Sequence, residues 1–276
     1  MCPWDDMATN WIVRHGAMRL LGEFEPEGGP YERGCEVVVR TERGLELGEV
    51  LCPASSRTLE LIAEPANGRI VRPLNEEDRQ QQAGMRDLER RELDTCIRFA
   101  RERRLQMELV DVEHLFGGER IVFYFLAEKR VDFRELVKDL AREYQTRIEM
   151  RQIGVRDEAK LLADYGDCGK PVCCNTHMTT MPPVSMRMAK LQKSTLDPSK
   201  ISGRCGRLKC CLRFEQDVYE EFQQELPPIG ARVLTQKGQG RVLAQEVLAR
   251  RLLVEFEDGR RLPVALGEIL TRLGKG

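Results

Sequence analysis

The chain is poor in aromatic residues and histidine, and it has no long hydrophobic run. Aromatic side chains make up 6% of its 276 residues, and only three histidines occur. No stretch reaches the roughly 18 consecutive apolar residues of a membrane helix, so no membrane insertion is expected. The N-terminus lacks a basic segment followed by an apolar core, which argues against a secretory signal. We therefore expect a cytoplasmic protein.

The motifs of several common enzyme classes are also missing. The sequence has no Walker phosphate-binding loop, no dinucleotide-type GxGxxG and no HExxH zinc motif. Its three histidines provide no convincing base or orienting partner for a cysteine nucleophile. These absences argue against the enzyme classes that use those motifs and against a cysteine-dependent enzyme.

Cysteine, by contrast, is abundant and ordered. Six of the ten cysteines lie in two nine-residue cassettes, residues 166–174 and 203–211, which share the pattern Gly-x-Cys-Gly-(Lys/Arg)-x-x-Cys-Cys. In a reducing compartment, clustered cysteines bind metal or carry out redox chemistry more often than they form structural disulfides. The predicted metal ligands are Cys168, Cys173, Cys174, Cys205, Cys210 and Cys211.

The spacing does not identify the metal. Thiolates are the soft ligands that iron–sulfur clusters, zinc and copper(I) select. The spacing within each cassette matches neither the usual pair of Cys-x2–4-Cys zinc knuckles nor the ferredoxin pattern. Iron–sulfur and zinc binding both stay open, as does the choice between one shared site and two. Six merely structural cysteines are disfavoured, because unrelated core cysteines would not repeat in register.

Charge is unevenly distributed along the chain. The net charge is −1, but the segment from Cys168 to Arg213 contains nine Lys or Arg residues against one acid, Asp197. Such a segment can offset the charge of a thiolate-ligated cluster, or contact nucleic acid or an acidic partner. The basic residues predicted to surround the cofactor are Lys170, Arg187, Lys190, Lys200, Arg204 and Arg207.

The hydrophobic pattern predicts an α+β chain in four parts. We expect a β-rich N-terminal unit, an α+β sandwich with an antiparallel sheet flanked by helices, a Cys-rich segment and a small SH3-like β-barrel. Their predicted ranges are residues 11–74, 75–163, 164–225 and 226–276.

Local signals predict several elements. Residues 41–44 are expected to form a hairpin turn, residues 147–152 a strand, and the C-terminal barrel four short strands. A strand is expected over 58–71, and a charged helix capped by Asn75 is expected to run to about residue 104. In the following strand the apolar phase shifts after Leu109, which indicates either a β-bulge or burial on both faces. Further helices are expected to begin at a cap formed by Asp132 and at about Asp217.

Four linked motifs carry a family resemblance. They cover residues 131–140, 147–160, 181–190 and 198–211, the last including the second cassette. On these residues the chain resembles the RicT (YaaT) family of bacterial proteins, whose conserved domain is named after a yeast polymerase-suppressor protein. The resemblance extends over roughly residues 11–222 and more weakly over the C-terminal barrel.

The resemblance implies a cytoplasmic, non-catalytic subunit. Family members join two small helical subunits, of the RicA and RicF types, in a complex that carries [4Fe–4S] clusters. That complex influences ribonuclease Y and so mRNA processing, with any RNA contact indirect. In spore formers it also bears on sporulation, competence and biofilm formation. The family's cluster-associated cysteines correspond to the six cassette cysteines.

Three hypotheses follow. The first is a regulatory iron–sulfur adaptor that docks partner proteins, with the charged helix over 75–104 as one candidate partner surface. The second is a zinc-stabilised nucleic-acid-binding module, in which the basic segment contacts phosphate. The third is a thiol oxidoreductase, in which nearby cations lower the pKa of a reactive cysteine.

Overall fold

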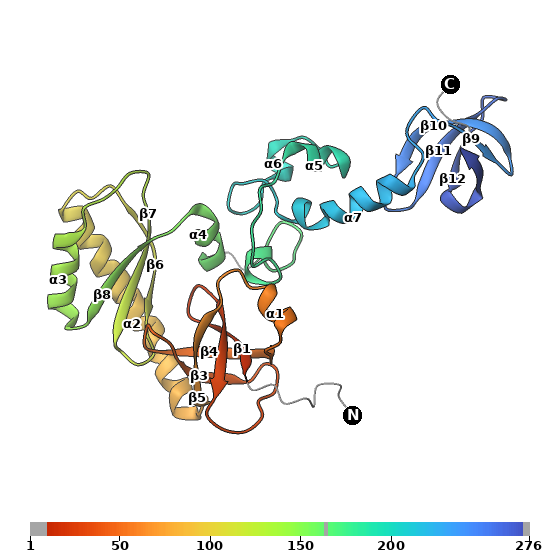
Figure 1. Cartoon of the computed structure of the whole chain (residues 1–276). Coiled ribbons are helices and arrows are strands. Elements are labelled where there is room, and N and C mark those ends of the chain that lie inside the picture. The colour runs from red at the N-terminus through yellow and green to blue at the C-terminus, as the bar shows by residue number, and fades with distance from the viewer. Residues whose placement is uncertain (1–9, 163–164, 273–276) are drawn as a thin grey trace. The chain divides into compact units, whose positions relative to one another are not determined.

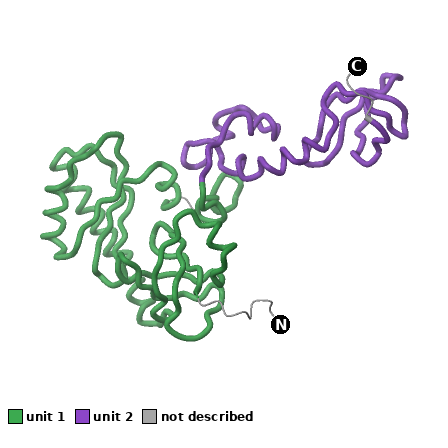
Figure 2. Tube along the Cα trace, in the orientation of Figure 1, with its two compact units in different colours: residues 1–180 green, residues 181–276 purple. Residues whose placement is uncertain are grey.

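A computed structural model of the chain describes residues 10–162 and 165–272. The chain forms two compact units, Met1–Thr180 and Met181–Gly276 (Figure 2). The first cassette belongs to the first unit and the second cassette to the second. Within the described ranges, no helix has both the length and the apolar character needed to cross a membrane.

The N-terminal part of the first unit is a closed five-stranded barrel with strand order β1-β2-β5-β3-β4 (Figure 1). The predicted β-rich unit is therefore confirmed, including the turn over 41–44 that joins β3 to β4. Valines and other apolar side chains such as Phe24 and Ile70 fill the barrel. Its elements are β1 (Trp11–His15), β2 (Leu20–Pro26), β3 (Glu36–Arg40), β4 (Leu45–Pro53), α1 (Ser56–Glu60) and β5 (Ala66–Pro73).

The prediction of a strand over 58–71 is only half correct. Residues 56–60 form the short helix α1, and strand β5 begins at Ala66. The Ser55 hydroxyl accepts a hydrogen bond from the Thr58 backbone N–H at 3.2 Å, and the Thr58 side chain accepts one from the Ser55 N–H at 2.8 Å. This reciprocal capping box starts a helix where side-chain composition alone favoured a strand.

The second part of the first unit is a three-stranded sheet, ordered β6-β7-β8, with helices α2 and α3 packed on one face (Figure 1). Asn75 and Asp78 form the capping box that starts α2, as the Asn75 cap predicted. Asp132 is not the N-cap of α3, because Phe133 occupies that position. The elements are α2 (Glu76–Glu102), β6 (Glu108–His114), β7 (Arg120–Leu126), α3 (Arg134–Tyr144), β8 (Arg147–Gln152) and α4 (Val155–Leu162).

This sheet is mixed rather than antiparallel. β6 and β7 form an antiparallel pair whose register shifts between Leu109 and Asp111, which favours the bulge over the other predicted alternative, burial on both faces. β8 runs parallel to β7, because α3 crosses over between them as in a β-α-β unit. Strand β7 is buried on both faces: Phe123 packs toward α2 and α3, and Tyr124 packs with Met18 of the β1–β2 hairpin.

The described residues of the second unit form three α-helices, a short 3₁₀ turn over 266–268 and a five-stranded antiparallel sheet ordered β12-β11-β10-β9-β13. One strand more is present than the four expected, because β13 returns to pair with β9. Within the described residues, hydrogen bonding leaves the sheet open between β12 and β13. The elements are α5 (Met186–Leu191), α6 (Pro198–Ile201), α7 (Cys211–Glu225), β9 (Arg232–Thr235), β10 (Gly238–Glu246), β11 (Arg251–Phe256), β12 (Arg261–Ala265) and β13 (Ile269–Arg272).

Candidate functional site

The two cassettes fold into the same hairpin. The Gly166 N–H donates to the Lys170 carbonyl at 2.8 Å, and the Gly203 N–H donates to the Arg207 carbonyl at 2.8 Å. Isolated β-bridges close both hairpins at equivalent positions, one between Tyr165 and Pro171 and the other between Ser202 and Leu208. The sequence repeat is therefore a structural repeat, bond for bond.

A glycine with positive φ closes each turn. Gly169 has φ +74° and Gly206 has φ +72°, and their N–H groups donate back to Gly166 and Gly203 at 3.0 and 2.9 Å. Only glycine adopts this conformation without strain. The adjacent cysteine folds back over the hairpin: a Cβ atom built at Gly166 would lie 3.5 Å from the Cys168 Sγ.

A helical turn follows each hairpin and carries the paired cysteines. The Cys173 carbonyl accepts from the Thr176 N–H at 3.2 Å, and the Cys210 carbonyl accepts from the Arg213 N–H at 3.0 Å. In the first cassette this turn is the single 3₁₀ turn over 173–175. In the second cassette it continues as α7, so this helix begins six residues before the expected Asp217.

The cysteines are accessible to differing degrees. Cys168 is exposed, and the other five cassette cysteines are half-buried. Among the described residues, no three or more Cys, His, Asp and Glu side chains lie close enough to hold a metal ion. The cysteine sulfur atoms are of the chemical type that a soft metal ion or an iron–sulfur cluster binds, and each cassette offers three of them on an ordered loop. Their ligation of a metal stays a prediction.

Each pair of cysteines has a charged neighbour. Burial lowers the pKa of the Lys160 amine, and the nearby Cys174 thiol opposes this shift. Burial, together with the neighbouring Cys210 and Glu215, raises the pKa of the Cys211 thiol. The Asn175 amide also ties the first cassette to α4, donating to the Lys160 carbonyl at 2.8 Å.

The basic residues predicted to surround the cofactor are all exposed, and none forms a salt bridge with an acid in the described part of the chain. Arg213, in the same basic segment, instead pairs with Asp217 at 2.8 Å. Exposed cations without acidic partners provide positive charge for an external anionic group. These residues are Lys170 in the first unit and Arg187, Lys190, Lys200, Arg204 and Arg207 in the second.

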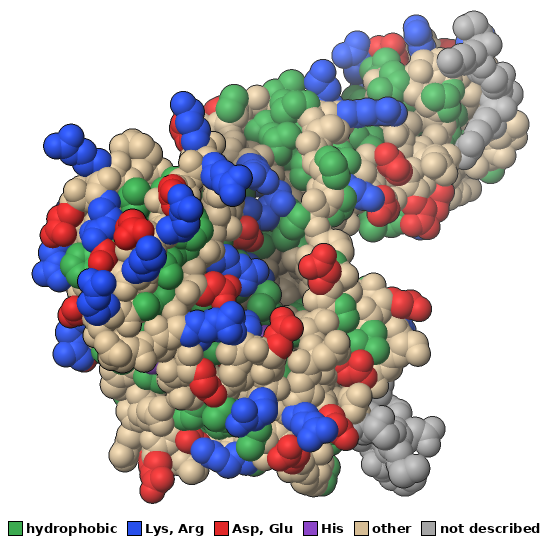
Figure 3. Space-filling view, turned by 60° about the vertical axis from the view of Figure 1, so that its left-hand side comes forward, with side chains coloured by type: hydrophobic (Ala, Val, Ile, Leu, Met, Phe, Trp, Pro, Cys, Tyr) green, Lys and Arg blue, Asp and Glu red, His purple; other side chains and the backbone are tan. Residues whose placement is uncertain are grey.

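Exposed hydrophobic side chains also gather in this part of the chain. Of the eleven exposed large hydrophobics among the described residues, seven fall between residues 155 and 218. Figure 3 shows hydrophobic and basic side chains exposed side by side on the second unit. Exposed apolar residues next to polar ones are typical of protein-interaction surfaces. The seven are Val155, Leu162, Tyr165, Met186, Leu196, Phe214 and Val218.

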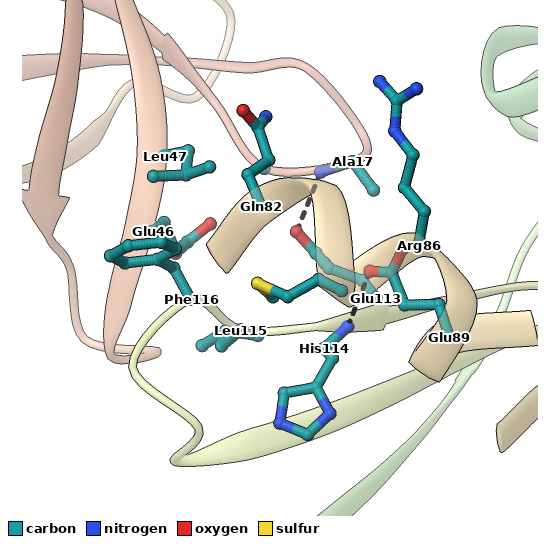
Figure 4. A pocket seen from close by; sticks show the side chains of 12 residues that line it. Ala17, Glu46, Leu47, Gln82, Arg86, Glu89, Glu113, His114, Leu115 and Phe116 are labelled. Carbon is teal, nitrogen blue, oxygen red and sulfur yellow. Dashed lines mark hydrogen bonds between the residues drawn. The ribbon is translucent and has the colours of Figure 1, made fainter. Parts of the chain in front are cut away.

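A second polar site, not predicted from the sequence, lies in the first unit between the barrel and the sandwich. It is a pocket of about 290 Å³ whose lining includes Glu46, Glu89 and Glu113 (Figure 4). Glu113 accepts from the Ala17 N–H at 2.8 Å and from the Tyr124 hydroxyl at 2.7 Å, and it pairs with Arg43.

The rest of this network surrounds Glu46 and Glu89. Glu46 is 2% exposed and accepts from the Thr41 hydroxyl at 2.6 Å; its other oxygen lies 3.1 Å from the His15 Nδ1. Burial raises the pKa of Glu89 to about 7, while the hydrogen bond from the His114 N–H opposes that shift. The network joins barrel to sandwich and contains no cassette residue, so we assign it a structural role.

Comparison with known proteins identifies the family. A model of the PSP1 C-terminal conserved region matches residues 68–153, and a model of the third domain of PSP1-like proteins matches residues 183–226. The first match spans β5 to β8, and the second spans α5 to α7 with the second cassette. Neither family description names a catalytic activity.

The curated relatives agree with these matches. The chain is 43% identical to the Stage 0 sporulation protein YaaT of Bacillus subtilis, over 84% of both chains. It is 31% identical to an uncharacterized protein of Schizosaccharomyces pombe over 41% of this chain and 19% of that one. A 45-residue stretch, 16% of this chain and 5% of the relative, is 38% identical to the protein PSP1 of Saccharomyces cerevisiae. No solved structure matches. The chain belongs to the YaaT/PSP1 family.

Proposed function

We propose that this protein is a non-catalytic regulatory subunit that binds a [4Fe–4S] cluster through its two cassettes and docks partner proteins. The observation that carries the proposal is that the two hairpins repeat the same backbone hydrogen bonds. As a result, Cys168 and Cys205 occupy equivalent backbone positions, and so do the two cysteine pairs that follow them. A fold that twice builds the same thiol-bearing turn favours ligand binding over core filling. When bound, the cluster would supply a redox-active centre.

The surroundings of the cassettes support the same proposal. A thiolate-ligated cluster carries negative charge, and exposed cations such as Lys170, Arg204 and Arg207 would offset it. The exposed hydrophobic side chains nearby would be covered by partners, which by family resemblance are small helical subunits of the RicA and RicF types.

The biological setting is inferred from the family. The relative in Bacillus subtilis is named as a sporulation protein. We infer a cytoplasmic complex that modulates ribonuclease Y-dependent mRNA processing, and sporulation, competence and biofilm development where the host forms spores. RNA would be affected through this complex, without direct recognition by the chain.

The test is anaerobic purification of the chain, alone and co-expressed with the two helical subunits, followed by a visible spectrum and analysis of iron, sulfide and zinc. We expect a brown complex with matched iron and sulfide. Cys173→Ser and Cys210→Ser should each remove the chromophore, whereas Cys35→Ser, in a half-buried cysteine outside the cassettes, should keep it. A colourless complex that forms without iron would refute the cluster proposal.

A second candidate function is favoured by the exposed cations of the basic segment. A zinc-stabilised nucleic-acid-binding module would contain stoichiometric zinc and would bind RNA with an affinity that falls steeply with salt. Arg207→Glu should then weaken RNA binding without changing the metal content. Binding that does not depend on salt, or the absence of zinc, would eliminate this candidate.

A further inference from the structure

Helix α7 has two of its sides covered within the second unit. One side, carrying Leu212 and Gln216, lies against α5, and the Gln192 amide donates to the Leu212 carbonyl at 2.5 Å. Further along the helix, Tyr219 and Phe222 pack against the core of the C-terminal sheet. These contacts fix the rotation of α7 about its axis, and therefore fix which side faces solvent.

The remaining side of α7 is apolar where it leaves the second cassette. Phe214 and Val218 lie one helical turn apart and are 58% and 45% exposed. Helical periodicity places them on the same side as Cys210 and Cys211, so the apolar stripe starts at the paired cysteines. The next position on this side is Glu221, which is exposed and ends the stripe.

The charge around this stripe is asymmetric. At the cassette end, Lys200, Arg204 and Arg207 are exposed and form no salt bridge among the described residues. Two exposed acids, Glu215 and Asp217, flank the stripe, and Asp217 is neutralised by Arg213 at 2.8 Å. The far end carries Glu221 and Glu225, and Glu225 pairs with Arg250 at 2.8 Å. A surface that is basic at one end and apolar in the middle is complementary to an acidic partner with an apolar ridge.

We propose that this side of α7, defined by Phe214 and Val218 and called here the α7 stripe, docks a helix of a different protein that has an acidic end and an apolar stripe of its own. The acidic end would lie over Lys200, Arg204 and Arg207. The proposal rests on the proposed function, and it names the docking surface and the chemistry of the partner.

A helix fits the stripe better than other occupants do. Two apolar side chains one turn apart form a short ridge that enters the groove between side-chain rows of another helix. A β-strand partner would need free backbone groups at a sheet edge, which a helix does not offer. Nucleic acid would gain charge contacts from the cations but would leave Val218 exposed. A second copy contributes only the same two apolar residues, which make a small interface.

The test places a photo-reactive benzoylphenylalanine at Phe214 in the co-expressed complex and sequences the cross-linked segment by mass spectrometry. The matched control places it at Leu248, which is 55% exposed in a turn of the same unit. We expect a cross-link at position 214 to an acidic helical segment of another protein. Val218→Glu should reduce its yield roughly tenfold or more, as loss of an interface anchor does. The pair Arg204→Glu and Arg207→Glu should also reduce it.

Several outcomes would overturn the proposal: a cross-link to a second copy, to RNA or to a basic segment, equal yields at positions 214 and 248, or no cross-link while the complex forms. Iron content separates this inference from the proposed function. If Val218→Glu leaves the complex brown with full cross-linking, the α7 stripe is wrong and the cluster function stands. If the wild-type complex contains no iron, the proposed function fails whatever the cross-link.

Discussion

Replacing Glu113 with glutamine should destabilise the first unit, because this carboxylate holds the barrel against the sandwich. Its side chain is 9% exposed and accepts from the Ala17 N–H, the Tyr124 hydroxyl and the Arg43 guanidinium. An amide keeps the size but offers one acceptor oxygen and turns an NH₂ group toward one of these donors. One buried hydrogen bond and the charge of the Arg43 pair are lost, at a cost of about 3 kcal/mol.

The assay uses the position of the tryptophans. Trp11 lies in β1 of the first unit, and the sequence from residue 181 to 276 contains no tryptophan, so urea unfolding followed by tryptophan fluorescence reports on the first unit. Glu108→Gln is the control, since Glu108 is exposed on the same strand, β6, and should change stability by less than about 0.5 kcal/mol. A loss below about 1 kcal/mol for Glu113→Gln would refute the reasoning.

Three further predictions concern the cassettes and the pocket. Gly206→Ala should lower the free energy of unfolding by about 1 kcal/mol through backbone strain alone, since the added methyl meets no atom within 4 Å. Gly259→Ala, at φ +80°, should have the same effect for the same reason. Only Gly206→Ala should also lower the iron content of the complex. Glu89 has a folded-state pKa raised to about 7, so its contribution to stability is complete below its usual pKa and is lost as the pH rises to about 7. Because the side chain is half-buried, Glu89→Gln should stabilise the first unit by about 1–2 kcal/mol at pH 8 and by almost nothing at pH 4 in urea unfolding. Asn175→Leu should change stability by less than about 1 kcal/mol, because one lost hydrogen bond is offset by removing a buried amide oxygen that has no partner among the described residues. A loss above about 2 kcal/mol in the same fluorescence assay would contradict this.

Features that depend on neighbouring residues were predictable from the sequence. The Asn75 cap, the turn over 41–44 and the bulge after Leu109 each arise from side-chain chemistry within a few positions. The strand over 147–152 was predicted with the bounds that the structure has. Such elements need no knowledge of what packs against them.

Features that depend on distant residues were not predictable. The barrel closes because β2 runs parallel to β5, and no local pattern specifies this pairing. Glu46 shows the limit most clearly. Alternation in β4 places Leu45 and Leu47 inside, yet the structure buries Glu46. The carboxylate tolerates burial because Thr41, Arg43 and His15 surround it, and His15 comes from another strand.

The structure of the cassettes depends on both neighbouring and distant residues, which explains why two similar sequences do not form identical structures. The repeat correctly predicts equivalent backbone turns, since both hairpins need a glycine at the position with positive φ. Their anchoring differs: the Asn175 amide donates to the Lys160 carbonyl of α4 in the first unit, whereas the equivalent Leu212 is buried in the first turn of α7, where its carbonyl accepts from the Gln192 amide. Only the second cassette therefore extends into a long helix with an exposed apolar stripe. If the two cassettes bind a cluster alike, partner docking should still depend mainly on the second, because only that copy presents a surface on which another helix can lie.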